Sequence, residues 1–288
     1  MPPALWGLLT ALGWGGADFV SRFTGGKLGV PVTLAGMMAS SLFLLSLAAW
    51  HTGTVLVFPD EGWALLLGSA CCLVLGTLLL YRGIVRGPIS LVAPIVAAYP
   101  VWSLILAVTL GVQPSWLQWA AMLAVMGGVV AVARLGGGAD AHASEAPGGL
   151  PVTIAIALAG SLCFALGLSG AQYSAPVFGE MQVLLTIRVL GASLAIGALI
   201  LVPRLRRPVP LRWWPLLVLQ GLLDGGAYLA LLAGSETAES ATASVVVASA
   251  FCVVPVVLAW IVLKERISAG QWLAIAVIVA GVAVLSAA

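Results

Sequence analysis

The chain is divided into ten long apolar runs bounded by glycine, proline or charged residues, and this pattern restricts the fold more than any other feature. A membrane-spanning helix uses about 20 residues, whereas a membrane β-strand uses about 9–11 residues in strict alternation. Only 8% of the residues are charged, too few to cover a water-soluble globule, where about 25% is usual. We therefore predict an all-α integral membrane protein with ten transmembrane helices, at residues 4–21, 32–50, 62–81, 89–110, 116–133, 151–173, 180–202, 213–232, 240–262 and 270–287.

The longest connection between the runs lies at the midpoint of the chain. It reads RLGGGADAHASEAPGGLP from Arg134 to Pro151, and its Gly, Ala, Ser and Pro content is typical of a flexible tether. We predict a first five-helix repeat at 1–135, a flexible linker at 136–150 and a second five-helix repeat at 151–288.

The two halves resemble each other in sequence. A shift of 153 residues places the pair Gln118-Trp119 on Gln271-Trp272, and a shift of 154 places the glycine pattern at 11–19 on that at 165–173. Because each half holds five runs, the second half must enter the membrane in the opposite sense. Such inverted repeats are typical of secondary transporters, with the substrate site near the midplane between them. We therefore expect two inverted repeats around a central cavity.

The basic residues predict an orientation. All Lys and Arg residues except Arg188 fall in the odd-numbered connections between runs. Cytoplasmic loops carry an excess of Lys and Arg. The sequence therefore predicts a multi-pass protein of the plasma (inner) membrane, with the odd-numbered connections in the cytoplasm and both termini outside.

Three ionisable residues fall inside the predicted spans, where a charge costs about 2.5–3.5 kcal/mol on insertion scales and therefore usually faces the protein interior or a wet cavity. Asp224 is a candidate substrate or proton site, or pairs with a neighbouring helix. Arg188 either binds a substrate carboxylate or phosphate, or is a structural partner of Asp224 or of Glu180. Asp18, near the end of the first predicted span, is either a site residue or an interfacial acid that reaches water near Arg22.

Aromatic residues deep in the spans are candidates for the cavity wall. Tyr228 follows Asp224 by four residues, on the same face of its helix, which favours both as cavity lining. Several deep aromatic rings together can bind a cation, although for each of them except Tyr228 the sequence slightly favours ordinary helix packing. The other deep aromatics are Trp14, Tyr99, Trp102 and Trp260, of which we take the first three as candidate substrate-binding residues.

Prolines in two related spans are candidate gating residues. Pro94 and Pro100 in the fourth span and Pro255 in the ninth lack an amide donor and should bend their helices. Such bends suit rocking between inward-open and outward-open states, although membrane helices tolerate prolines generally.

Three features carry a family resemblance: the two glycine-rich first helices of the halves, APIVAAYP at 93–100, and LKERIS at 263–268 followed by Gln271-Trp272. By these features the chain resembles the EamA-like branch of the drug/metabolite transporter superfamily. The resemblance implies ten helices in two inverted repeats, a central cavity and alternating access. Members move amino acids, nucleotide sugars, choline-like cations and other small metabolites, often as exporters. The resemblance makes Asp18 the nearest counterpart of an essential acid in the first helix of small four-helix proton-coupled relatives. Ten-helix relatives usually have cytoplasmic termini, the reverse of the orientation that the charges predict.

Several function classes are disfavoured by what the sequence lacks. It has no metal-ligand cluster, phosphate-binding glycine loop or nucleophile elbow, so we expect no metal, no cofactor and no enzymatic activity. A net charge of +2 does not suggest a nucleic-acid partner. We predict a secondary active transporter in the lipid bilayer, an exporter of small polar or amphipathic metabolites such as amino acids, with protons as a candidate coupling ion. The alternative is a transporter of organic or quaternary cations, and a second alternative is a lipid flippase or an intramembrane enzyme.

Overall fold

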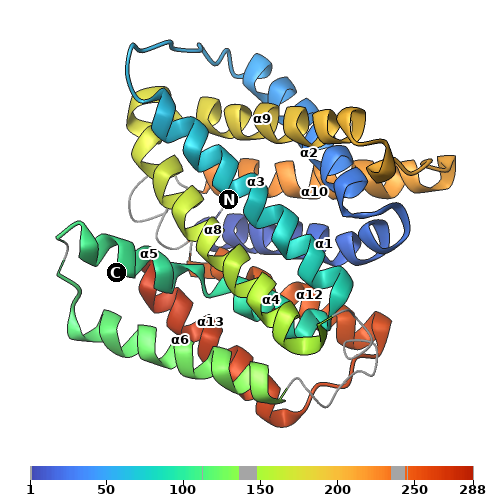
Figure 1. Cartoon of the computed structure of the whole chain (residues 1–288). Helices are drawn as coiled ribbons and strands as arrows, with labels where there is room; N and C mark the ends of the chain where they lie inside the picture. Colours follow the sequence, from blue (N-terminus) through green and yellow to red (C-terminus); the bar gives the residue numbers. More distant parts are fainter. Residues whose placement is uncertain (1, 112, 136–147, 235–243, 245, 288) are drawn as a thin grey trace.

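A computed structural model describes residues 2–111, 113–135, 148–234, 244 and 246–287, with side chains up to residue 285. All regular secondary structure in these residues is helical (Figure 1). Most of the predicted linker 136–150, namely residues 136–147, lies outside the described residues, as does the start of the predicted ninth span.

The helices follow the ten predicted runs in order. The first half contains α1 (Pro3–Leu28), α2 (Val30–His51), α3 (Trp63–Arg86), α4 (Ile89–Ala97) with α5 (Tyr99–Thr109), and α6 (Trp116–Leu135). The second half contains α8 (Gly149–Phe178), α9 (Glu180–Leu201), η2 (Pro203–Leu205), η3 (Leu211–Trp213), α10 (Trp214–Ala233), η4 (Ser249–Cys252), α12 (Val253–Leu258), η5 (Ala259–Leu263) and α13 (Ala269–Ala287). The fourth run is thus two helices, and the ninth passes from 3-10 through α to π geometry.

Eight helical segments of the described chain are long and apolar enough to cross a membrane. The two further long helices are α1 and α13. In α1 the glycines and Asp18 lower the mean hydropathy, although the helix has 26 residues. In α13 the apolar stretch Ala269–Leu285 is shorter than that of the eight.

The contacts between helices come in pairs, because each contact has a counterpart in which the roles of the two halves are interchanged. α1 packs on α10 and α3 packs on α8, while α1 also contacts α12 and α8 contacts α5. These contacts explain why the glycines are repeated, because α1 approaches α10 closely and α8 approaches α3 closely. A Cβ on Gly13 would lie 2.8 Å from the Cβ of Ala227, and a Cβ on Gly167 would lie 2.5 Å from the Cγ of Leu73. The same 154-residue shift relates both contacts, as expected for a two-fold axis between the halves.

The repeated glutamines begin the last helix of each half. At α6 the Ser115 amide donates to Gln118 Oε1 (2.7 Å) and the Gln118 amide donates to Ser115 Oγ (3.3 Å). At α13 Ser268 and Gln271 make the same two bonds at 2.9 and 3.2 Å. Each pair is a capping box, which satisfies amides that a helix start leaves without partners. The sequence match between the halves therefore reflects a repeated helix start.

Three helices extend well beyond the C-terminal ends of their predicted spans. α1 ends at Leu28, α3 at Arg86 and α8 at Phe178, whereas the apolar runs end at residues 21, 81 and 173. In α1 and α3 the last turn holds a basic side chain, Lys27 and Arg86, which interacts favourably with the helix dipole. The connections α1–α2, α9–α10 and α12–α13 lie at one end of the bundle, on the right in Figure 1, with α2–α3 and α5–α6 at the opposite end. We call the end that holds the α1–α2, α9–α10 and α12–α13 connections the basic end.

Candidate substrate cavity

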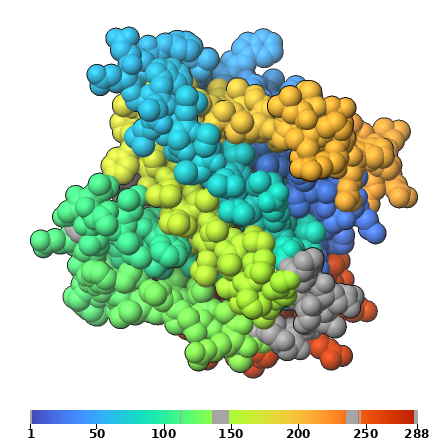
Figure 2. Space-filling model, viewed as in Figure 1, coloured from blue at the N-terminus to red at the C-terminus, as the bar shows by residue number. Residues whose placement is uncertain are grey.

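A cavity of about 710 Å³ lies between the two halves. This volume is in the range of small-molecule sites, about 300–1,000 Å³. Its walls come mainly from α1, α3, α5, α8, α10 and η4, and α3 and α8 lie side by side on the face shown in Figure 2. Its polar lining residues are Asp18, Thr77, Tyr81, Tyr99, Ser103, Ser169, Gln172, Tyr173, Arg188, Asp224, Tyr228 and Ser249.

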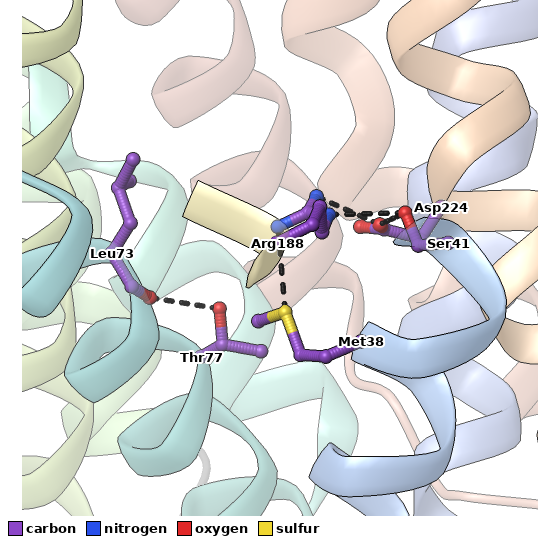
Figure 3. A network of polar contacts seen from close by, with 6 residues as sticks. All are labelled: Met38, Ser41, Leu73, Thr77, Arg188 and Asp224. Atoms are coloured by element: carbon purple, nitrogen blue, oxygen red, sulfur yellow. Dashed lines mark hydrogen bonds and ion pairs between the residues drawn. The ribbon is translucent and has the colours of Figure 1, made fainter. Parts of the chain in front are cut away.

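An ion pair lies in the cavity wall. Arg188 Nη2 of α9 is 2.7 Å from Asp224 Oδ2 of α10. Ser41 of α2 joins the two, because its Oγ accepts a bond from Arg188 Nε (3.0 Å) and donates to Asp224 Oδ2 (2.8 Å). Arg188 Nη1 contacts Met38 Sδ at 3.6 Å. Figure 3 shows these contacts converging on the guanidinium. All three guanidinium nitrogens therefore donate to protein atoms.

Aromatic rings extend the site from the ion pair toward α1 and η4. The guanidinium carbon of Arg188 lies 4.8 Å from the centre of the Tyr228 ring, within the range of a cation–π contact. Trp14 meets Tyr228 edge to face at 5.0 Å and Phe251 at 6.0 Å. All three rings line the cavity. They form an aromatic wall next to the two acids.

Asp18 does not lie near a helix end, where the sequence places it, but within α1. α1 continues for ten residues beyond it, so Asp18 lies inside the helix, is only 8% exposed and lines the cavity. The prediction of an interfacial acid was wrong because α1 does not end at Arg22. Within the described parts of the chain, no hydrogen-bond donor or cation contacts the Asp18 carboxylate, unlike that of Asp224.

The other candidate residues divide into two groups. Tyr99 and Pro100 line the cavity, whereas Trp102, Pro94 and Pro255 are not in its wall. Trp102 lies partly buried on α5. Trp260 is 52% exposed and its ring contacts that of Trp272, so it lies on the outside of the bundle instead of deep within it.

The prolines stand next to irregular helix geometry. α4 passes through Pro94 without a break, and the fourth run is interrupted at Ala98, two residues before Pro100. Pro255 lies in the six-residue α12 between 3-10 and π segments and packs against Gly15 of α1. Their gating role stays a prediction.

Sequence reasoning missed several polar residues of the site. Ser41, Thr77, Ser103 and Ser169 are hydroxyl residues in apolar helices, and nothing in their local sequence separates them from ordinary packing residues. Tyr81 stands at the end of a predicted span, but α3 continues past it and places it in the wall, 2% exposed. If the first and third predicted spans had been longer, the sequence would have placed both Asp18 and Tyr81 well inside their helices.

Comparison with known proteins gives a family and a fold. The EamA-like transporter family matches residues 1–134 and 151–287. No curated protein matches the sequence. A solved structure titled only "Crystal structure of protein" is similar over 98% of this chain and 95% of its own, with a TM-score of 0.67 and 18% identity. At that identity the likeness concerns the fold alone.

Proposed function

Because the chain belongs to the EamA-like transporter family, we propose that it is a secondary active transporter that carries small organic cations by alternating access. The observation that carries the proposal is that the charged groups of the cavity differ in whether they have partners within the protein. Three of the five guanidinium N–H groups of Arg188 donate within the protein, and Asp224 already balances its charge, so Arg188 offers a substrate carboxylate less than an unpaired arginine would. Asp18, in the same cavity, has a carboxylate without a partner among the described residues.

A buried carboxylate without a partner is costly when ionised. A cation that enters the cavity removes that cost, and so does a proton bound to the same carboxylate. The aromatic wall of Trp14, Tyr228 and Phe251 suits the apolar part of an organic cation. A single acid that holds either a proton or the substrate couples the two as an antiporter. With an inward proton gradient across the plasma membrane, such exchange exports the substrate.

The proposal includes the membrane topology. α1 has 26 residues and α13 has 19, about 39 and 28 Å at 1.5 Å per residue, and the hydrocarbon core is about 30 Å thick. We propose that both cross the bilayer, which makes ten spans in two inverted repeats, 1–135 and 151–288. The basic end is then cytoplasmic and both termini are external. A reporter fused after Ala288 should be active outside the cell, and a cytoplasmic signal there would contradict the orientation.

Amino acids are the second candidate substrate class. The supporting observation is that Arg188 and Asp224 both line the cavity. A substrate carboxylate that replaced Asp224 at Arg188 would leave Asp224 for the substrate ammonium group.

Transport by the purified chain in proteoliposomes separates these proposals. We expect uptake of radiolabelled choline into vesicles with an acidic lumen, and no uptake of leucine. Asp18→Asn keeps the size of the side chain but cannot exchange a proton, so it should abolish proton-driven choline uptake. Asp60→Asn, at an exposed acid outside the cavity, is the matched control and should transport normally.

The outcomes are distinct. Leucine uptake without choline uptake would replace the cation proposal by the amino-acid one. Full choline uptake by Asp18→Asn would remove Asp18 from the mechanism. A preparation that stays folded and moves neither compound would reject both substrate classes.

A further inference from the structure

The cavity opens toward the end of the bundle opposite the basic end. Its wall reaches Leu110 at the end of α5 and Tyr173 near the end of α8, which are 63% and 60% exposed. On the basic side its wall ends at buried residues such as Tyr81 of α3 and Val96 near the end of α4. All nine residues of α4 are buried. α4 is therefore part of the seal between the cavity and the basic end.

A carboxylate from the second half holds the start of this sealing helix. Glu265 lies in the connection between η5 and α13, and it is only 5% exposed. Its Oε1 accepts a hydrogen bond from the amide of Ile89 (3.0 Å) and its Oε2 accepts one from the amide of Ser90 (3.2 Å). Lys264, directly before it, has a left-handed backbone with φ 55°, which turns the chain at this point.

The contact satisfies groups that α4 cannot satisfy itself. The first amides of a helix have no acceptor within the helix, and a negative charge there interacts favourably with the helix dipole. Hydrogen bonds to an ionised carboxylate are about twice as strong as neutral ones. Because Glu265 is buried, water does not easily replace it. The contact thus ties the second half to α4 of the first.

The helix before α4 is held from another side. Arg22 of α1 donates to the carbonyl oxygens of Ile84 and Gly87, the latter at 3.0 Å, at the end of α3. The break at Ala98 separates α4 from α5, which lines the cavity. Release of the first turn of α4 would therefore let α4 move at this break while α5 stays in the cavity wall.

We propose that Glu265 is a positioning residue of the transport cycle. It holds α4 closed over the basic end, and the basic end opens when Glu265 releases the amides of Ile89 and Ser90. The 153-residue shift places Val112 at the equivalent position of the first half, so the sequence repeat does not carry this carboxylate over to the opposite end. The inference rests on the alternating-access part of the proposed function.

Cysteine labelling tests the proposal directly. Ser90 is 1% exposed and its hydroxyl has no hydrogen-bond partner in the described structure, so Ser90→Cys is a conservative reporter of opening. It is made in a chain whose four cysteines are replaced by alanine, and the maleimide labelling rate is measured in nanodiscs. Glu265→Ala should raise that rate roughly tenfold, since bonds to a charged group are lost. Glu265→Gln, which keeps one acceptor oxygen and the size of the side chain, should raise it less.

Glu180→Ala is the matched control, because Glu180 is an exposed acid in the first turn of α9, and it should not change the rate. If Glu265→Ala does not fold, as judged by gel filtration, Glu265→Gln serves as the test by itself. An unchanged labelling rate in the folded Glu265 variants would overturn the proposal. Labelling needs no substrate, so a rate that depends on Glu265 supports the contact even if choline transport fails. Intact choline transport with an unchanged rate rejects only the role of Glu265.

Discussion

Removal of one member of the Arg188–Asp224 pair should be more damaging than removal of both. Arg188 is 4% exposed and Asp224 13%. In Asp224→Ala the guanidinium keeps Ser41, Met38 and the Tyr228 ring, but loses its counter-charge. Breaking a buried pair in this way costs about 3–5 kcal/mol. Because Asp224 borders the cavity and water reaches it, we expect about 3 kcal/mol.

The double variant Arg188→Met/Asp224→Ala should recover most of this loss. Replacement of a buried ion pair by apolar side chains is often neutral or stabilising, so its unfolding free energy should lie within about 1 kcal/mol of the parent. Methionine fits because Met38 already lies against the guanidinium at 3.6 Å. The measurement is equilibrium unfolding in mixed micelles of increasing SDS content, followed by circular dichroism. Asp60→Ala, at an exposed acid, should change the unfolding free energy by less than about 0.5 kcal/mol.

Two results would refute this reasoning. If Asp224→Ala is as stable as Asp60→Ala, the pair contributes nothing to the fold. If the double variant loses as much free energy of unfolding as both single variants together, the two residues act independently.

The same unfolding assay, and choline uptake, test three further expectations. An ideal Cβ at Gly221 would lie 2.4 Å from the nearest atom of α2, so Gly221→Ala should cost about 1–3 kcal/mol. Gly226, in the same helix, has open space at that position, so Gly226→Ala should gain about 0.5–1 kcal/mol; equal effects at the two glycines would contradict the close packing. Gln271→Ala should cost about 1 kcal/mol through its capping box, and no loss would show that the box is dispensable. Trp14→Ala should raise the KM for choline about tenfold, by the 1–2 kcal/mol of a partly desolvated cation–π contact, whereas Trp260→Ala on the outer surface should leave it unchanged; a rise in both would indicate a general defect.

The sequence predicted the helical segments and the most conspicuous charges of the site. Charged residues within apolar runs stand out, so Arg188 and Asp224 were found, and their pairing was one of the alternatives. The family resemblance is confirmed by the match of both halves, and the fold is that of a solved structure. Helix ends were harder, because a hydropathy pattern detects where apolar sequence stops and not where hydrogen bonding stops. That is why Asp18 was placed too close to an interface.

Contacts between distant segments could not be read from the chain. Ser41 is a site residue only because α2 crosses α9 and α10 at that height. Glu265 is one of several charged residues in a short connection, and its burial depends on the path of α4, more than 170 residues earlier in the sequence. By contrast, Gln118 and Gln271 carried a local signal, since each caps a helix three residues from its serine partner.

The order in which the chain is made adds a consequence to the ion pair. Arg188 leaves the ribosome 36 residues before Asp224, so α9 enters the lipid while its counter-charge is still being synthesised. An arginine at the centre of an inserting helix costs about 2.5–3.5 kcal/mol. Ser41 and Met38 on α2 precede Arg188 in the chain and contact its guanidinium in the folded protein. Part of the polar environment of Arg188 is therefore synthesised before the arginine itself.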